Sequence, residues 1–166
     1  MVKYALIALI ALVVAAGAYF LFFKKDELSL VKAQIGSLAA EASKQSQQEA
    51  PLTSAAKAQA LAGLFAETCE VKIDGVPISG VFRRDEIPGH AMLVRGHFQK
   101  ALFTIHDLDA ELATELTAKA SFTIMLVGTL GNGESVREVR DINAQLVKAD
   151  GKWRISSLLV ASPVKK

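Results

Sequence analysis

The chain has 166 residues, of which 51% are hydrophobic, a formal net charge of +2 and one cysteine, Cys69. A charge this close to neutral gives no basis for binding nucleic acid, and a single cysteine excludes an internal disulfide and any cysteine-cluster metal site. The length allows one modest domain with additional segments.

The first segment is an uncharged apolar run from Tyr4 to Phe23, with Lys3 before it and Lys24 after it. A helix of this length spans about 30 Å, the thickness of a hydrocarbon core, so residues 4–23 are expected to lie in membrane lipid. A cleaved signal peptide ending near Ala18 is the alternative, but the apolar run continues beyond that site. We therefore expect a single-pass protein of the bacterial inner membrane, with its domain outside the cytoplasm.

The next segment, residues 26–52, is expected to form a stalk helix followed by a linker. Apolar residues recur there with the 3-4-3-4 spacing of a coiled-coil seam: Leu28, Val31, Ile35, Leu38 and Ala42. The seam covers only about two heptads, so packing on the chain's own domain or on the bilayer surface is favoured over self-association. Pro51 marks a break before the folded domain.

Residues 53–163 have the pattern of one α+β domain. The expected elements are a helix from Thr53 or Ser54 to about Glu67, a strand over Glu70–Ile73 that turns back through Val76–Ile78, a helix near Arg84–Phe103, and strands over Ile105–Leu112, Thr117–Thr129, Val136–Val147 and Lys152–Ala161. Pro88 is tolerated only in the first turn of its helix. Helices that precede a series of antiparallel strands predict helices packed on a curved antiparallel sheet.

The last two strands are joined by Asp150-Gly151, a strong signal for a type I′ hairpin turn. Alternation along the returning strand places Trp153, Ile155, Ser157 and Leu159 on one face.

This stretch carries a family resemblance. Leu64-Phe65-Ala66 at the end of the first helix, the segment from Asp74 to Gly80, and the ending Asp150-Gly151-Lys152-Trp153-Arg154-Ile155 resemble the nuclear transport factor 2-like superfamily, over about Ala55 to Pro163. The resemblance implies a cone-shaped α+β fold with a pocket between the concave sheet face and the helices. Such folds include isomerases, dehydratases, hydrolases, ligand binders and scaffolds, so the fold does not determine the function.

Catalytic residues are scarce in this sequence. Ketosteroid-isomerase-like members use a tyrosine to hold an oxyanion, but the only tyrosines here, Tyr4 and Tyr19, lie in the expected membrane helix. No catalytic set is therefore predicted. The best candidate for a general base is His97 or His106 beside Asp107 (or Asp109), because an imidazole titrates near neutral pH and a carboxylate can orient it. No metal site or cofactor motif is evident.

A ligand or partner surface is expected where charged residues gather, at Arg95, Arg137, Glu138, Arg140 and Asp141. On the expected strand, Glu138 and Arg140 share one face and Arg137 and Asp141 the other. A solvated ladder of charges is favoured over an epoxide-hydrolase-like Asp-Arg-Asp set.

Two functional hypotheses follow. The favoured one is a membrane-anchored, non-catalytic interaction or scaffold module that binds a protein partner or forms a homo-oligomer. The alternative is a small-molecule-binding or hydrolase/isomerase-type protein that uses the cone interior. An interior filled by Phe82, Phe98, Phe103, Phe122 and Trp153 would count against the alternative.

Overall fold

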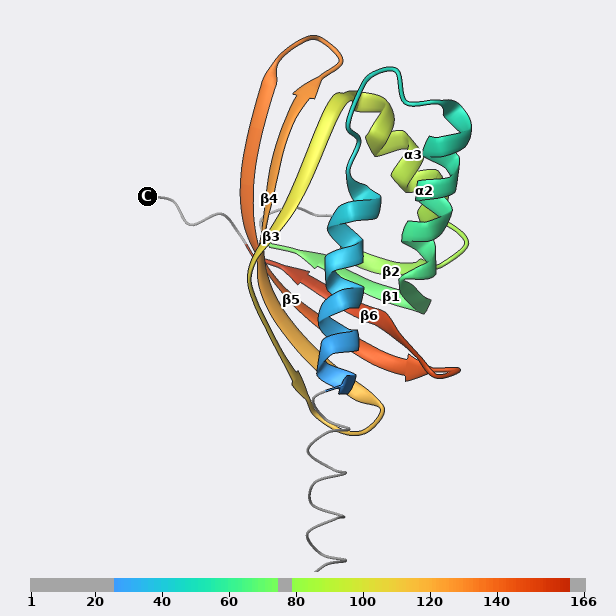
Figure 1. Ribbon diagram of the computed structural model, residues 1–166, viewed down its shortest axis with the longest axis vertical. Helices are drawn as coiled ribbons and strands as arrows, with labels where there is room; N and C mark the ends of the chain where they lie inside the picture. Colours follow the sequence, from blue (N-terminus) through green and yellow to red (C-terminus); the bar gives the residue numbers. More distant parts are fainter. Residues whose placement is uncertain (1–25, 75–78, 162–166) are drawn as a thin grey trace, which may run out of the picture.

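The computed structural model describes residues 26–74 and 79–161. A helix over residues 26–42 is followed by α2 (Pro51–Gly63), β1 (Phe65–Ile73), β2 (Ser79–Arg83), α3 (Ile87–His97), β3 (Phe98–Leu112), β4 (Thr117–Leu130), β5 (Ser135–Ala149) and β6 (Lys152–Val160). The six strands form one curved sheet in the order β2-β1-β6-β5-β4-β3, and the helices cover one of its faces (Figure 1). Only the β1–β6 pair is parallel. This architecture confirms the predicted α+β fold.

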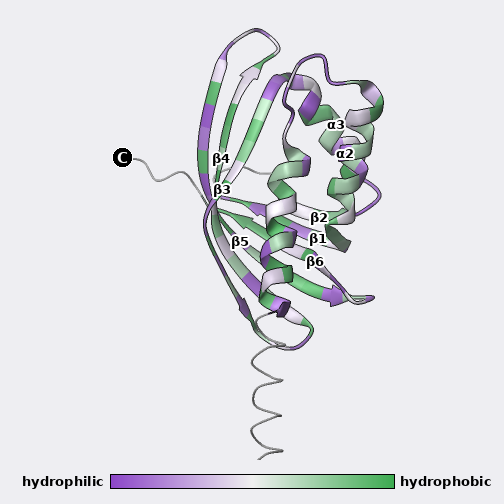
Figure 2. Ribbon diagram, in the orientation of Figure 1, coloured by the Kyte–Doolittle hydropathy of each residue, from purple (hydrophilic) through white to green (hydrophobic). Residues whose placement is uncertain are grey.

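The hydrophobic core lies between the 26–42 helix and the sheet. Val31, Ile35 and Leu38 on one helix face pack into a cluster that contains Leu146 and Ile155 of the sheet. This is the apolar stripe that the 3-4 spacing predicted, and it confirms packing on the chain's own domain. Because the seam is buried inside the domain, nothing supports its use as a coiled coil. The core also joins residues from both sides of the expected boundary near residue 53. Strands that alternate between hydrophobic and hydrophilic residues supply the other half of this core (Figure 2).

The expected membrane anchor, Tyr4 to Phe23, lies outside the described residues. Within residues 26–74 and 79–161, no helix is both long enough and apolar enough to cross a membrane. The anchor therefore stays a prediction.

Both helices of the domain end earlier than the sequence pattern predicts. The first runs from Pro51 to Gly63, because Phe65 already pairs with Ile155 in the sheet. The second ends at His97, and Phe98 adopts extended backbone (φ −109°, ψ 137°) and begins β3. Tertiary strand pairing thus overrides local helical spacing at both ends. Pro88 lies in the first turn of α3, as predicted.

Two of the register shifts in the sheet are β-bulges that affect which side chains face the core. On β6, Ile155 pairs with Leu146 and Ser157 with Gln145, so Ser156 is the extra residue. The bulge corrects the predicted alternation: Trp153 and Ile155 are buried in the core, but Leu158 and Val160 join them there, while Ser157 and Leu159 move to the other face. A second bulge lies on β3 between His106 and Asp109, where Asp107 has a φ of 51°.

One buried carboxylate connects the first turn of the 26–42 helix to the β5–β6 hairpin. Glu27 is 6% exposed, and its two oxygens accept hydrogen bonds from Lys148 Nζ and Trp153 Nε1, each 2.7 Å long. The hydrogen bond from Lys148 holds the pKa of Glu27 below its usual value, against the opposing effect of burial. The contact fixes the helix against the sheet.

Candidate ligand-binding pocket

The candidate catalytic residues from the sequence do not form a catalytic set. His97 is exposed at the end of α3, while His106 and Asp107 are exposed on β3. His106 Nε2 lies 3.1 Å from Thr104 Oγ1, a neighbour on its own strand. In the part of the chain that the structure describes, no group of three His, Cys, Asp or Glu side chains could hold a metal ion.

Arg95, expected on a ligand or partner surface, is 5% exposed and connects secondary-structure elements. Its Nη1 donates to the carbonyl oxygens of residues 41–43, at 2.9–3.2 Å, and so satisfies the C-terminal end of the 26–42 helix. Its Nη2 pairs with Glu49 at 2.5 Å. In return, Lys44 Nζ donates to the carbonyl oxygens of Arg95 and Phe98 at the end of α3. Arg95 of α3 therefore satisfies the end of the 26–42 helix, and Lys44, just after that helix, satisfies the end of α3.

The four charged residues expected on β5 divide between the two sheet faces. Glu138 and Arg140 form an ion pair of 2.9 Å on the face that also carries Ile142. Asp141, on the opposite face, accepts a 2.7 Å hydrogen bond from Thr123 Oγ1, and Arg137 is exposed on that same face. The sheet therefore does not bring all four together as one surface.

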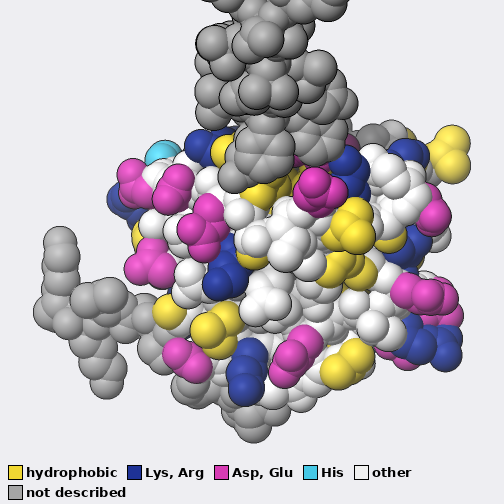
Figure 3. Space-filling model, turned by 90° about the horizontal axis from the view of Figure 1, so that it is seen from below, with side chains coloured by type: hydrophobic (Ala, Val, Ile, Leu, Met, Phe, Trp, Pro, Cys, Tyr) yellow, Lys and Arg dark blue, Asp and Glu magenta, His cyan; other side chains and the backbone are white. Residues whose placement is uncertain are grey.

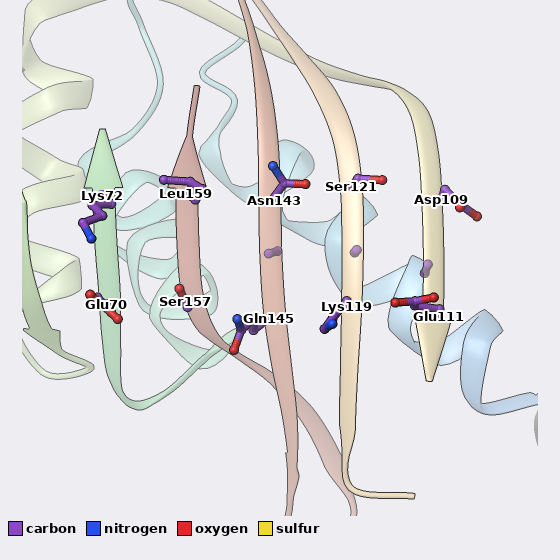
Figure 4. A pocket seen from close by; sticks show the side chains of 13 residues that line it. Glu70, Lys72, Asp109, Glu111, Lys119, Ser121, Asn143, Gln145, Ser157 and Leu159 are labelled. Carbon is purple, nitrogen blue, oxygen red and sulfur yellow. The ribbon is translucent and has the colours of Figure 1, made fainter. Parts of the chain in front are cut away.

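A polar hollow of about 520 Å³ lies on the helix-free face of the sheet (Figure 4). Side chains of five adjacent strands line it, and the labelled polar ones are Glu70, Lys72, Asp109, Glu111, Lys119, Ser121, Asn143, Gln145 and Ser157. These ionic groups are exposed and of both signs. Acidic and basic side chains are likewise interspersed over the face seen in Figure 3. Water can solvate all of these charges, so the hollow shows no preference for one kind of ligand.

A larger cavity, which we term the side pocket, lies beside the edge of the sheet and has a volume of about 1030 Å³. The end of α2, the start of β1, the turn between β2 and α3 and the β5–β6 turn all contribute to its wall. Ala62, Ala66, Pro88 and Ala149 provide small apolar surfaces. Small-molecule sites commonly have volumes of roughly 300–1,000 Å³ and mostly apolar walls with a few polar groups.

Arg84 is the distinctive polar group of the side pocket. The residue is half-buried, and its Nε is buried without a hydrogen-bond partner. Its backbone N–H is satisfied by the Glu67 carbonyl at 2.9 Å, so only the side chain is left unpaired. A buried donor without an acceptor costs roughly 1–3 kcal/mol, and more when it is charged. The guanidinium that carries this Nε forms part of the cavity wall.

The neighbouring Arg83 is not available in the same way. Its guanidinium forms an exposed ion pair with Asp85 in the same turn. The hydrogen bond from Arg83 holds the pKa of Asp85 below its usual value, so Asp85 is ionised at neutral pH. Glu67 and Asp150 are the other acidic residues of the wall.

The cone interior, where the sequence predicted a pocket, is occupied by the hydrophobic core. Phe122 and Trp153 are each 3% exposed there, as expected, and Val31 and Ile35 of the 26–42 helix fill much of the remaining space. The other three phenylalanines expected in the interior are only partly buried. The candidate pocket is therefore displaced to the edge of the sheet.

The sequence pattern placed Arg84 at the start of a helix and did not single it out as a site residue. The run Arg83-Arg84-Asp85-Glu86 was a visible signal of a charged turn, but its pairing depends on the backbone. The turn directs Arg83 to Asp85 and leaves Arg84 on the cavity wall. Of these two arginines, only Arg84 therefore has a buried Nε without an acceptor.

No protein-family model matches this sequence, and no curated protein matches it. Solved structures do share the fold. A protein assigned as a scytalone dehydratase from Novosphingobium aromaticivorans has a TM-score of 0.66 at 14% identity, over 81% of this chain and 82% of that one. A protein assigned as an aromatic ring hydroxylase from the same species has a TM-score of 0.68 at 10% identity, over 84% and 91%. The hexachlorocyclohexane dehydrochlorinase LinA-type3 of Novosphingobium barchaimii has a TM-score of 0.58 at 13% identity, over 80% and 83%.

These structures have the nuclear transport factor 2-like fold, so the fold implied by the resemblance is confirmed. They also correct the favoured hypothesis of a membrane-anchored, non-catalytic scaffold, because several of the solved structures that share this fold are named for enzymatic activities. The buried seam of the 26–42 helix points the same way, since it is not available to a partner. The alternative hypothesis, a protein with a ligand-binding or catalytic pocket, is the better supported one.

Proposed function

We propose that this chain binds a small organic molecule in the side pocket. The observation that carries the proposal is the cavity itself, about 1030 Å³ between α2, the edge of the sheet and the turn before α3, whose wall combines small apolar residues with polar and charged ones. Support also comes from the solved structures of the same fold that are named for reactions on small molecules. The proposal concerns binding and specifies no reaction.

The test is a fragment screen by amide NMR on the full chain, which at 17.8 kDa is small enough for residue-level assignment. We expect bound fragments to shift the amide signals of the pocket wall, such as Gly63, Thr68 and Asp150. Shifts confined to the helix-free face of the sheet, or the absence of any bound fragment, would refute the proposal.

A matched pair of variants sharpens this test. Thr68 is exposed on β1 and lines the pocket, so Thr68→Trp should fill the cavity and abolish binding. Thr104 is an exposed threonine on β3 outside the pocket, so Thr104→Trp should bind fragments as the natural chain does. Equal loss in both variants would show that the tryptophan disturbs the fold and that the loss is not specific to the pocket.

A further inference from the structure

We propose that the ligand of the side pocket carries a carboxylate group and that Arg84 binds it. This inference rests on the proposed function, since it requires that the pocket holds a small molecule. It adds the chemical class of the ligand and the residue that recognises it.

The first argument is the isolation of Arg84. The five other arginines have acceptors within the protein: Arg83 has Asp85, Arg95 has Glu49, Arg137 has the Met125 sulfur, Arg140 has Glu138, and Arg154 has the Gly63 carbonyl. For Arg84, no ion pair or side-chain hydrogen bond is formed with any residue in 26–74 or 79–161, and its Nε is buried. A guanidinium that is always charged, and that lines a cavity without an acceptor, is suited to an anion.

The second argument concerns which anion fits. Two carboxylates of the pocket wall, Glu67 and Asp150, belong to residues that form no ion pair in the described part of the chain, and Asp85 is already paired with Arg83. A doubly charged phosphate would therefore meet one free cation and two repelling carboxylates. A carboxylate carries a single charge, and its two oxygens match the parallel N–H groups of a guanidinium.

The experiment compares three probes of similar shape against the full chain at constant ionic strength: benzoate, neutral benzamide and phenyl phosphate. Their dissociation constants are measured by titration of the amide NMR signals of the pocket wall. We expect benzoate to bind roughly tenfold or more tightly than benzamide, since the contact is a charge-assisted hydrogen bond. Phenyl phosphate should bind more weakly than benzoate.

The variant Arg84→Gln should reduce the affinity for benzoate by roughly tenfold to a hundredfold and leave benzamide nearly unaffected. Lys32→Gln removes the same charge from an exposed site on the 26–42 helix and should change neither affinity. Without ligand, Arg84→Gln should melt no lower than the natural chain, because the Arg84 side chain forms no ion pair or hydrogen bond with the described residues that the substitution would break. An unchanged melting temperature with lost benzoate binding is the supporting result.

The outcomes separate the two proposals. Equal binding of benzoate and benzamide, or benzoate binding that survives Arg84→Gln, would overturn the carboxylate assignment and leave the pocket function standing. Phenyl phosphate that binds as tightly as benzoate would overturn it too. If neither these probes nor the screened fragments shift the pocket signals, both proposals fail.

Discussion

Glu27→Gln is the sharpest test of how the 26–42 helix is held in the domain. The substitution preserves size and lets the side-chain carbonyl still accept from Trp153 Nε1, but it removes the charge that faces Lys148. Breaking a buried ion pair costs roughly 3–5 kcal/mol. The Lys148 side chain is 18% exposed, so water can partly solvate the freed ammonium. We therefore expect a loss of about 2–3 kcal/mol in the free energy of unfolding, starting from the lower end of that range.

The assay is urea denaturation followed by the fluorescence of Trp153, the only tryptophan of the chain and itself a partner of Glu27. A domain of this size should melt about 8–12 °C lower after such a loss. Asp26→Asn removes the adjacent, exposed carboxylate and serves as the control. A loss below about 0.5 kcal/mol for Glu27→Gln, similar to that of an ordinary surface substitution, would refute the reasoning.

The pH dependence provides a second check with a definite sign. The folded protein lowers the pKa of Glu27, and the unfolded value is about 4.3. The carboxylate therefore contributes stability above the unfolded pKa and loses this contribution as the pH falls through the folded pKa. The difference between the natural chain and Glu27→Gln should be constant between pH 7 and about pH 5.5 and should shrink in more acidic solution. A difference that grows in acid would contradict the assignment.

Three further predictions follow from the packing. Arg95→Met should cost roughly 3 kcal/mol in urea denaturation, because it removes a donor from the Glu49 carboxylate and from three carbonyls, of which Lys57 still serves only Glu49 and Ser43; a loss under about 1 kcal/mol would contradict its connecting role. Gly128→Ala should destabilise by about 1–3 kcal/mol, since the new Cβ would lie 2.6 Å from the Lys100 carbonyl oxygen, whereas Gly96→Ala, with open space on α3, should stabilise by up to about 1 kcal/mol. The reverse order of melting temperatures would disprove this. Burial raises the pKa of Cys69 to about 11, so a thiol reagent at pH 8 should label the native chain far more slowly than the urea-unfolded chain, and equal rates would refute its burial.

Several features were accessible from the sequence because they depend on neighbouring residues alone. Asp150-Gly151 forms the predicted tight turn, with φ values of 52° and 72°. Pro88 lies in the first turn of its helix, because it lacks the N–H that an interior position needs. The apolar spacing that starts at Val31 identified a helix with one buried face. The closing hairpin with Trp153 also suggested the correct fold.

Other features are determined only by partners that are distant in sequence. The early ends of α2 and α3 result from pairing of Phe65 with Ile155 of β6 and of Phe98 with Leu130 of β4. The bulge at Ser156 moves the residues after it to the opposite face of the sheet. The spacing of apolar residues along β6 does not specify where this extra residue lies.

The side pocket belongs to this second class. Its wall combines four elements, and the isolation of Arg84 depends on where the turn before α3 places its side chain relative to the acidic residues of the wall. A sequence shows which groups can form hydrogen bonds, but burial and distance decide which of them remain unpaired. The periodicity of this chain therefore determined its class of fold, whereas the position of the pocket and the charge it presents were decided by tertiary contacts.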